Sequence, residues 1–156
     1  MKWIMTGLLA LGILGFSAPA PQAQDDDIRP LIEIWAEEPT RIFEAHGINL
    51  NEFRFIARPV IIFADSPNDP NFRHQMELLA ERPEDLAERD VIVITDTDPA
   101  NPSALRLELR PRGFMLVLID KEGGVALRKP QPWDLRELTR SIDKSPLRQQ
   151  EIEDRR

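Results

Sequence analysis

Residues 60–95, VIIFADSPNDPNFRHQMELLAERPEDLAERDVIVIT, decide the fold of this chain. The two mostly apolar runs at residues 60–64 and 90–95 are typical of strands that are buried on both faces. Between them, Asp69 can cap a helix that begins at Pro70. The apolar side chains of this helix recur on one face: Phe72, Met76, Leu79 and Ala80. A strand, a helix and a second buried strand in this order predict a parallel pair joined by a right-handed crossover.

The residues after this unit predict an antiparallel half of the same sheet. Two apolar runs, residues 114–120 and 125–129, flank a turn with two glycines, which is typical of a β-hairpin. Residues 96–113 carry both helical and alternating patterns, and we expect a short helix there. A last helix begins at Pro132 and stops or kinks at Pro146. The order β-α-β-(α)-β-β-α predicts an α/β protein with a central mixed sheet flanked by helices, and it resembles the thioredoxin-like fold.

The N-terminus has the three parts of a secretory signal peptide. Lys2 supplies the positive charge, and small residues follow the apolar run at residues 4–16. This run is too short to cross the ~30 Å hydrocarbon layer comfortably. We expect cleavage after Ala23, so that residues 1–23 are the signal peptide and the protein is periplasmic or secreted, without stable membrane insertion. An uncleaved N-terminal anchor is the alternative.

The remaining chain is expected to have three parts. Residues 24–49 are acidic, and we expect a partly helical lead-in lying on the domain, with a short helix before Pro39 and a small turn at residues 40–45. Residues 50–146 are expected to form the thioredoxin-like domain. Residues 147–156 are a polar tail, either frayed or one extra solvated turn.

The composition excludes several kinds of function. The 156 residues suit one domain with its own core. The chain has no cysteine, which excludes disulfides, thiolate nucleophiles and thiolate metal sites. The formal net charge is −7, so nucleic acid is not an expected partner. No phosphate-binding glycine loop, zinc motif or nucleophile elbow is present in the sequence, and we expect no cofactor.

Four stretches resemble the family catalogued as domain of unknown function 4174: FRFIARPVIIFADSPNDP, LAERDVIVI, RGFMLVLIDKEGGVALR and LTRSIDKSPLRQQE. The similarity covers about residues 50–150, and IDKEGG and IDKSPLRQQE are its most specific parts. None of these segments is a catalytic motif. The resemblance implies a fold like that of thioredoxins and peroxiredoxins and a short exported protein, and it implies no established reaction.

The resemblance to thioredoxins also implies which chemistry is absent. Thiol-redox members carry the reactive cysteine after the first buried strand of the core, at the start of a helix. The matching segment here is DSPND, residues 65–69. The proline expected before the third strand is also missing near Gly113, since the nearest one is Pro111. Thiol oxidoreductase and peroxidase activities are therefore not expected.

Acidic and hydroxyl side chains follow both strands of the predicted parallel pair. Asp65, Ser66 and Asp69 come after the first strand, and Asp96 follows the second. The carboxyl ends of neighbouring parallel strands lie at one edge of a sheet, where open α/β sheets bind ligands. These oxygens can hold Ca²⁺ or Mg²⁺, although no fixed ligand spacing is present. The alternative is that they are ordinary turn and cap residues.

Basic residues are expected to gather near the base of the hairpin. Arg110 and Arg112 precede it, and Arg106 and Arg128 belong to neighbouring segments. Arginines in such a patch can bind a carboxylate or a phosphate with two hydrogen bonds. The alternative is a set of ordinary solvated charges.

Three functions are compatible with these features. The first is an exported, non-catalytic thioredoxin-like module that binds an envelope protein or a small anionic ligand. The second is an envelope hydrolase that uses a divalent cation on the acidic edge of the sheet. The third is a structural accessory whose lead-in and tail dock on an envelope partner.

Overall fold

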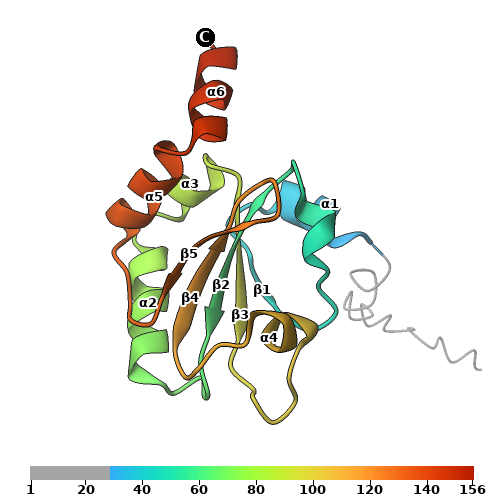
Figure 1. The fold of residues 1–156 in the computed structure, drawn as a ribbon, viewed down its shortest axis with the longest axis vertical. Coiled ribbons are helices and arrows are strands. Elements are labelled where there is room, and N and C mark those ends of the chain that lie inside the picture. Colours follow the sequence, from blue (N-terminus) through green and yellow to red (C-terminus); the bar gives the residue numbers. More distant parts are fainter. Residues whose placement is uncertain (1–28) are drawn as a thin grey trace, which may run out of the picture.

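The computed structural model describes residues 29–156, which form one five-stranded sheet with helices on both faces (Figure 1). The expected signal peptide, residues 1–23, lies outside the described residues. The strand order is β1-β3-β2-β4-β5. The strands are β1 (Ile42–Glu44), β2 (Arg58–Phe63), β3 (Val91–Asp96), β4 (Met115–Ile119) and β5 (Val125–Lys129). The helices are α1 (Leu31–Glu37), η1 (Leu50–Phe53), α2 (Pro70–Ala80), α3 (Pro83–Ala87), α4 (Ala104–Leu109), α5 (Leu135–Asp143) and α6 (Pro146–Asp154).

The sheet is parallel in one half and antiparallel in the other, as the sequence predicts. β2 pairs in parallel with β3, with Val60 opposite Val93. β2 also pairs antiparallel with β4, where Val60 lies opposite Leu118, and β4 forms the hairpin with β5. The predicted parallel pair, the hairpin and the mixed central sheet are therefore confirmed.

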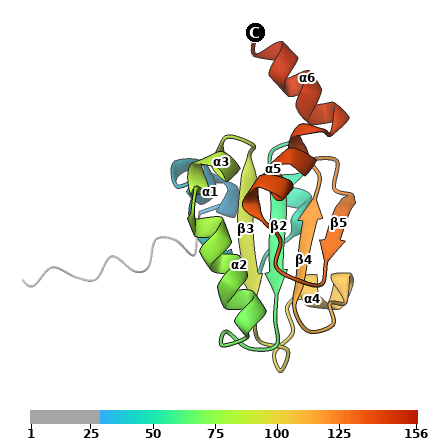
Figure 2. The same cartoon turned by 90° about the vertical axis from the view of Figure 1, so that its left-hand side faces the viewer.

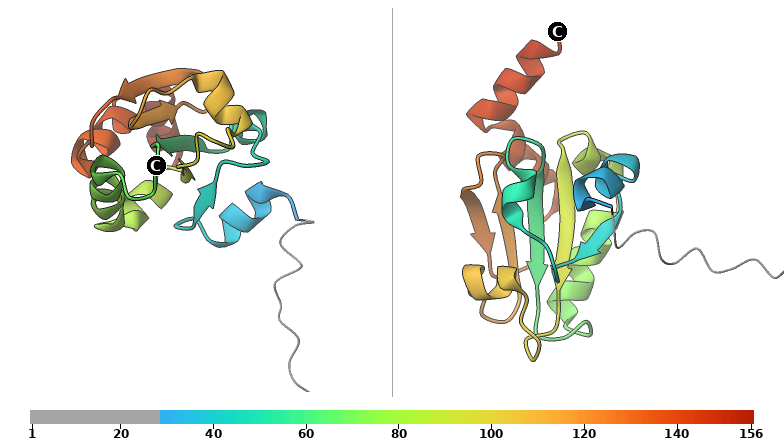
Figure 3. Two further views of the ribbon diagram at one scale, coloured as in Figure 1. Left: turned by 90° about the horizontal axis from the view of Figure 1, so that it is seen from below. Right: turned by 90° about the vertical axis from the view of Figure 1, so that its right-hand side faces the viewer.

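The two faces of the sheet bury separate apolar clusters, because side chains alternate along each strand. α2, α3 and α5 cover one face (Figure 2), which contains Val60 and Ile62 of β2. α1, η1 and α4 cover the other face (Figure 3), which contains Ile61 and Phe63. All four of these β2 side chains have 0% exposure, which accounts for the continuous apolar run that marks this strand in the sequence.

Two helices confirm local sequence signals. α2 begins where Asp69 and Pro70 predict, and the Asp69 carboxylate accepts hydrogen bonds from the N–H groups of Asn71 and Phe72. α4 is the expected short helix of the ambiguous segment. Ser103 caps α4 by accepting a hydrogen bond from the N–H of Arg106. A third helix, α3, was not expected, and Pro83 is its first residue.

The structure corrects the expectation of a turn at residues 40–45, because residues 42–44 form β1. β1 is a parallel edge strand beside β3, with Phe43 opposite Ile94. Phe43 is buried in the cluster that α1 covers, together with Ile34 and Trp35. A three-residue strand shows too little alternation to be recognised in the sequence, and its pairing with β3 depends on contacts about 50 residues away.

The last residues of the chain form α6, which projects away from the body of the molecule (Figures 1 and 2). Segment 147–156 was expected to be frayed or solvated, yet Arg148 has 2% exposure. Among the described residues, no helix is long and apolar enough to cross a membrane.

Candidate functional site

A polar cleft of about 300 Å³ lies at the carboxyl ends of β1 and β3. Its lining residues come from these strand ends and the loops after them: Glu44, His46, Thr95, Asp96, Thr97, Asp98 and Asn101. The His46 Nε2 atom lies 3.0 Å from the carbonyl oxygen of Asn101, which joins the two loops. Of the four candidates at this edge, Asp96 lines the cleft, whereas Asp65, Ser66 and Asp69 are not among its lining residues.

Asp96 is held in a buried ion pair with Arg106 of α4. The guanidinium contacts the carboxylate at 2.9 Å through Nε and at 2.8 Å through Nη2, and the Ser103 hydroxyl donates a further hydrogen bond at 2.5 Å. Burial alone raises the pKa of Asp96, but the hydrogen bonds from Arg106 and Ser103 outweigh it and lower the pKa below its usual value. Asp96 is therefore an ionised acid with a structural role, and the positive charge of Arg106 compensates its negative charge.

The loop after β2 holds the other acidic candidates in turn and cap geometry. The Ser66 hydroxyl accepts a hydrogen bond from the Asn68 N–H at 3.1 Å, and Asp69 caps α2. Asp65 is exposed, with its carboxylate 3.8 Å from Nη1 of Arg106. Within residues 29–156 no group of three or more His, Asp or Glu side chains is arranged to hold a metal ion. These contacts match the turn-and-cap interpretation of the loop.

The arginines near the hairpin do not all face the same space. Arg106 is buried against Asp96, and Arg128 donates to the carbonyl oxygen of Leu109 at the end of α4. Arg110 is exposed at the end of α4 with φ +49°, and Arg112 is also exposed. Two of the four arginines are thus engaged by the fold itself.

A network of charges lies at the opposite end of the sheet. Glu151 of α6 contacts Arg58 of β2 at 2.9 Å and Lys121 of the hairpin turn at 2.9 Å, and Lys121 reaches Asp90 at 2.7 Å. Burial alone raises the pKa of Glu151, but the hydrogen bonds and charges of Lys121 and Arg58 outweigh it and lower the pKa to about 2. These contacts anchor α6 to the amino ends of β2 and β3.

The same network continues along the junction of α5 and α6. Arg89 makes two hydrogen bonds to the Asp143 carboxylate, at 2.8 and 2.9 Å, and the hydrogen bond to Asp143 raises the pKa of Arg89. Arg148 lies between Glu151, at 3.3 Å, and Asp143, at 3.6 Å. The segments IDKEGG and IDKSPLRQQE supply Lys121, Asp143, Arg148 and Glu151. Both segments therefore supply contacts that hold the C-terminal helix in place.

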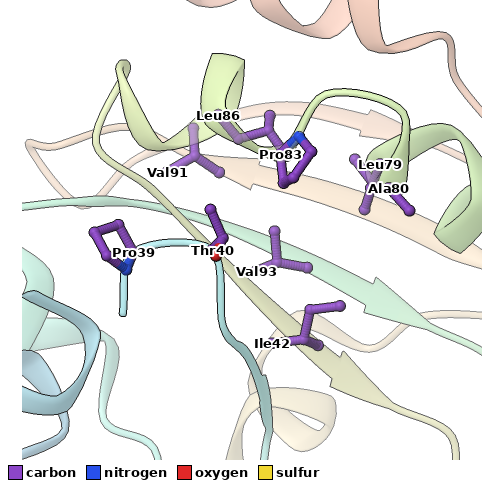
Figure 4. Close-up of a pocket in the computed structure, with 9 residues that line it drawn as sticks. All are labelled: Pro39, Thr40, Ile42, Leu79, Ala80, Pro83, Leu86, Val91 and Val93. Atoms are coloured by element: carbon purple, nitrogen blue, oxygen red, sulfur yellow. The ribbon is translucent and has the colours of Figure 1, made fainter. Parts of the chain in front are cut away.

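An apolar groove of about 220 Å³ lies on the α2 side of the sheet, beside β1 (Figure 4). It is lined by Pro39, Thr40, Ile42, Leu79, Ala80, Pro83, Leu86, Val91 and Val93. The sequence analysis missed this groove, because its floor requires β1 to be a strand. The signal that the sequence offered is the pair of apolar residues Pro39 and Ile42 in a segment otherwise rich in acids.

The mixed sheet and its two helical layers define a thioredoxin-like fold, and similar folds occur among solved structures. The reduced 2-Cys peroxiredoxin of Plasmodium vivax superposes with a TM-score of 0.52 at 16% identity, covering 67% of this chain and 85% of that one. Thioredoxin peroxidase I of Plasmodium yoelii gives a TM-score of 0.48 at 16% identity, covering 67% and 80%.

The family model described as domain of unknown function (DUF4174) matches residues 49–151. The chain therefore belongs to this family. A comparison with curated proteins gives no match. The likeness to the peroxiredoxin structures concerns the fold, since this chain has no cysteine in the loop after β2 or elsewhere.

Proposed function

We propose that this protein is an exported, non-catalytic binding module that has a thioredoxin-like fold and lacks thiol-redox activity. The observation that carries the proposal is the contrast between the two concave sites. The central acid of the polar cleft, Asp96, is locked by Arg106, whereas Ile42 in the apolar groove is 49% exposed. A carboxylate that is already held in an ion pair serves to stabilise the fold. An exposed apolar groove, in contrast, is a common feature of binding sites.

The cation-dependent hydrolase receives no support from the geometry. It requires Asp65, Asp69 and Asp96 to offer free oxygens to one ion. Asp69 instead accepts two main-chain hydrogen bonds, and Asp96 pairs with Arg106. Only the exposed Asp65 of these three is without a buried or capping role.

Export rests on the sequence of residues 1–23, with its positive start, apolar run and small residues. The absence of cysteine fits a compartment where an unpaired thiol is a liability. The acidic net charge favours partners that carry positive charge over nucleic acid or anionic surfaces.

The test uses the full chain with a C-terminal tag, expressed in bacteria. Mass spectrometry of the purified protein is expected to show an N-terminus at Gln24, and cell fractionation is expected to place it outside the cytoplasm. Cross-linking in cells is expected to yield one stoichiometric partner, and disulfide-reduction and peroxide-reduction assays are expected to show no turnover. An intact N-terminus in the cytoplasmic fraction contradicts export, and turnover in either assay contradicts the non-catalytic role.

A further inference from the structure

We propose that the apolar groove and the outer edge of β1 together bind an extended segment of a partner protein, in which one large apolar side chain is flanked by basic residues. This inference rests on the proposed function, because it names the surface and the chemistry of the partner for the same binding module.

The groove exists because the helices on this face stop before the end of the sheet. Val91 and Val93 of β3 are buried beneath α2 and α3, at 1% and 7% exposure. In β1, Ile42 lies opposite Val93 and shares its face, yet no helix of the described chain covers it and it is 49% exposed. On the other face, Phe43 is 7% exposed under α1. One apolar strip of the sheet thus remains open.

The dimensions of the groove favour a side chain over a small molecule. Pockets for drug-sized ligands usually measure about 300–1,000 Å³ and contain several convergent polar groups. This groove measures about 220 Å³, and Thr40 is the one polar side chain among its nine lining residues. A pocket of this kind suits one buried anchor residue of a partner protein, such as an aromatic or a large aliphatic side chain.

The outer edge of β1 offers main-chain hydrogen bonds beside the groove. The Ala45 N–H donates to the carbonyl oxygen of Thr95 at 3.0 Å, so alternate residues of this segment face β3. The N–H and C=O groups of Ile42 and Glu44 therefore point away from the sheet. β1 is the end strand of the order, and within residues 29–156 no further strand pairs with it. Such an edge accepts an added strand.

Acidic side chains surround the groove and set the charge of the partner. Exposed glutamates stand next to its lining residues in the chain or on the same strand face: Glu38, Glu44, Glu81 and Glu84. Two arginines lie in the same segments, and each has an acidic neighbour: Arg41 is 4.0 Å from Glu38, and Arg82 is 3.2 Å from Asp85. The excess of negative charge is complementary to a basic segment and favours its approach.

The experiment measures fluorescence anisotropy of a labelled peptide, Lys-Val-Lys-Val-Trp-Val-Lys-Val-Lys, titrated with the mature full chain. Two further probes replace every lysine by glutamate or the tryptophan by glycine. We expect binding of the first peptide, weakened about tenfold or more by either change and weakened by salt. Equal binding of the glutamate or the glycine probe overturns the proposal, as does no binding of the first peptide.

The variants place the binding at the groove. Ile42→Asp is expected to weaken binding about tenfold, and Glu81→Gln with Glu84→Gln to weaken it and reduce its salt dependence. Val125→Asp is the matched control, because Val125 lies on the opposite edge strand with 46% exposure. If Ile42→Asp does not fold, Ala80→Arg, at an exposed position of the groove, serves instead. Unchanged binding by the groove variants, or an equal loss with Val125→Asp, overturns the proposal.

Two further measurements distinguish a partner segment in the groove from the alternative occupants. Sedimentation equilibrium is expected to show a monomer, and self-association that Ile42→Asp abolishes overturns the proposal in favour of a second copy of this chain. The cross-linking in cells is repeated with Ile42→Asp. Loss of the stoichiometric partner supports the groove. A partner captured equally well by this variant overturns the groove and leaves the proposed function standing. If no partner is captured and the peptide does not bind, both the groove proposal and the proposed function are overturned.

Discussion

Asp96 and Arg106 form an ion pair that ties the carboxyl end of β3 to α4. The closest contact, between Oδ1 and Nη2, is 2.8 Å, and the two side chains are 1% and 9% exposed. Arg106 also donates to the carbonyl oxygens of Ala64 and Asp96, at 2.7 and 2.9 Å, so it bridges the ends of β2 and β3. Arg106 thus joins α4 to the carboxyl ends of β2 and β3, and Asp96, at the predicted ligand edge, is its partner.

Replacing one partner of this pair is expected to destabilise the protein strongly. Asp96→Asn leaves the buried guanidinium without its counter-charge, which costs about 3 kcal/mol of the free energy of unfolding. Urea denaturation measures this loss. The double variant Asp96→Asn, Arg106→Met is expected to lose less than the sum of the two single variants, because no unpaired buried charge remains. Strict additivity of the two losses contradicts a coupled pair.

The Glu151 cluster is expected to make stability depend on acidity. The pKa of Glu151 falls from 4.5 to about 2 on folding, so its contribution is complete above about pH 4.5 and is lost as the pH falls toward 2. The shift corresponds to stability on the order of 3 kcal/mol. Thermal unfolding between pH 2 and 6 measures this dependence.

Two variants of α6 separate this cluster from general acid unfolding. Glu151→Gln is expected to lower the unfolding temperature at pH 6 and to flatten its decline in acid. Glu153→Gln, an exposed position on the same helix, is expected to behave as the unchanged protein. An unaltered pH profile with Glu151→Gln contradicts the role of this carboxylate.

Asp69 is expected to contribute as a helix cap and not as a metal ligand. Asp69→Ala removes the acceptor for the N–H groups of Asn71 and Phe72 and is expected to cost about 1 kcal/mol. The unfolding temperature is expected to stay unchanged with Ca²⁺, Mg²⁺ or EDTA. Stabilisation by either cation that disappears with Asp65→Asn supports the hydrolase and contradicts the proposed function.

Two neighbouring residues of β1 are expected to differ sharply. Phe43→Ala removes a side chain that is 7% exposed in the core, and it is expected to cost about 3 kcal/mol. Ile42→Ala, at 49% exposure, is expected to change the free energy of unfolding by less than about 1 kcal/mol. Equal effects on denaturant unfolding contradict the placement of β1 as a half-covered edge strand.

The apolar groove illustrates how a surface can be hidden from sequence reasoning. Its lining residues come from four separate segments, and each segment looks like ordinary core or turn when considered alone. The polar edge presents the opposite case. Asp65, Ser66, Asp69 and Asp96 attract attention as a group, yet Asp69 and Asp96 serve caps and ion pairs within the fold.

The sequence by itself determined the features that depend on local pattern. Continuous apolar runs defined β2 and β3, the paired glycines defined the hairpin, and Asp69 with Pro70 defined the start of α2. The absence of cysteine excluded functions that need a thiol, and no structure was required for that conclusion. These features are readable because burial on both faces, turn geometry and helix capping each require particular residue types at neighbouring positions.

The tertiary structure alone decided the features that depend on distant partners. β1 forms because Phe43 packs under α1 and pairs with β3, and α6 is anchored because Glu151 meets Arg58 and Lys121. No local pattern requires either contact. Strand pairing and buried ion pairs take their free energy from groups brought together across the chain, so they become visible when the whole sheet is assembled.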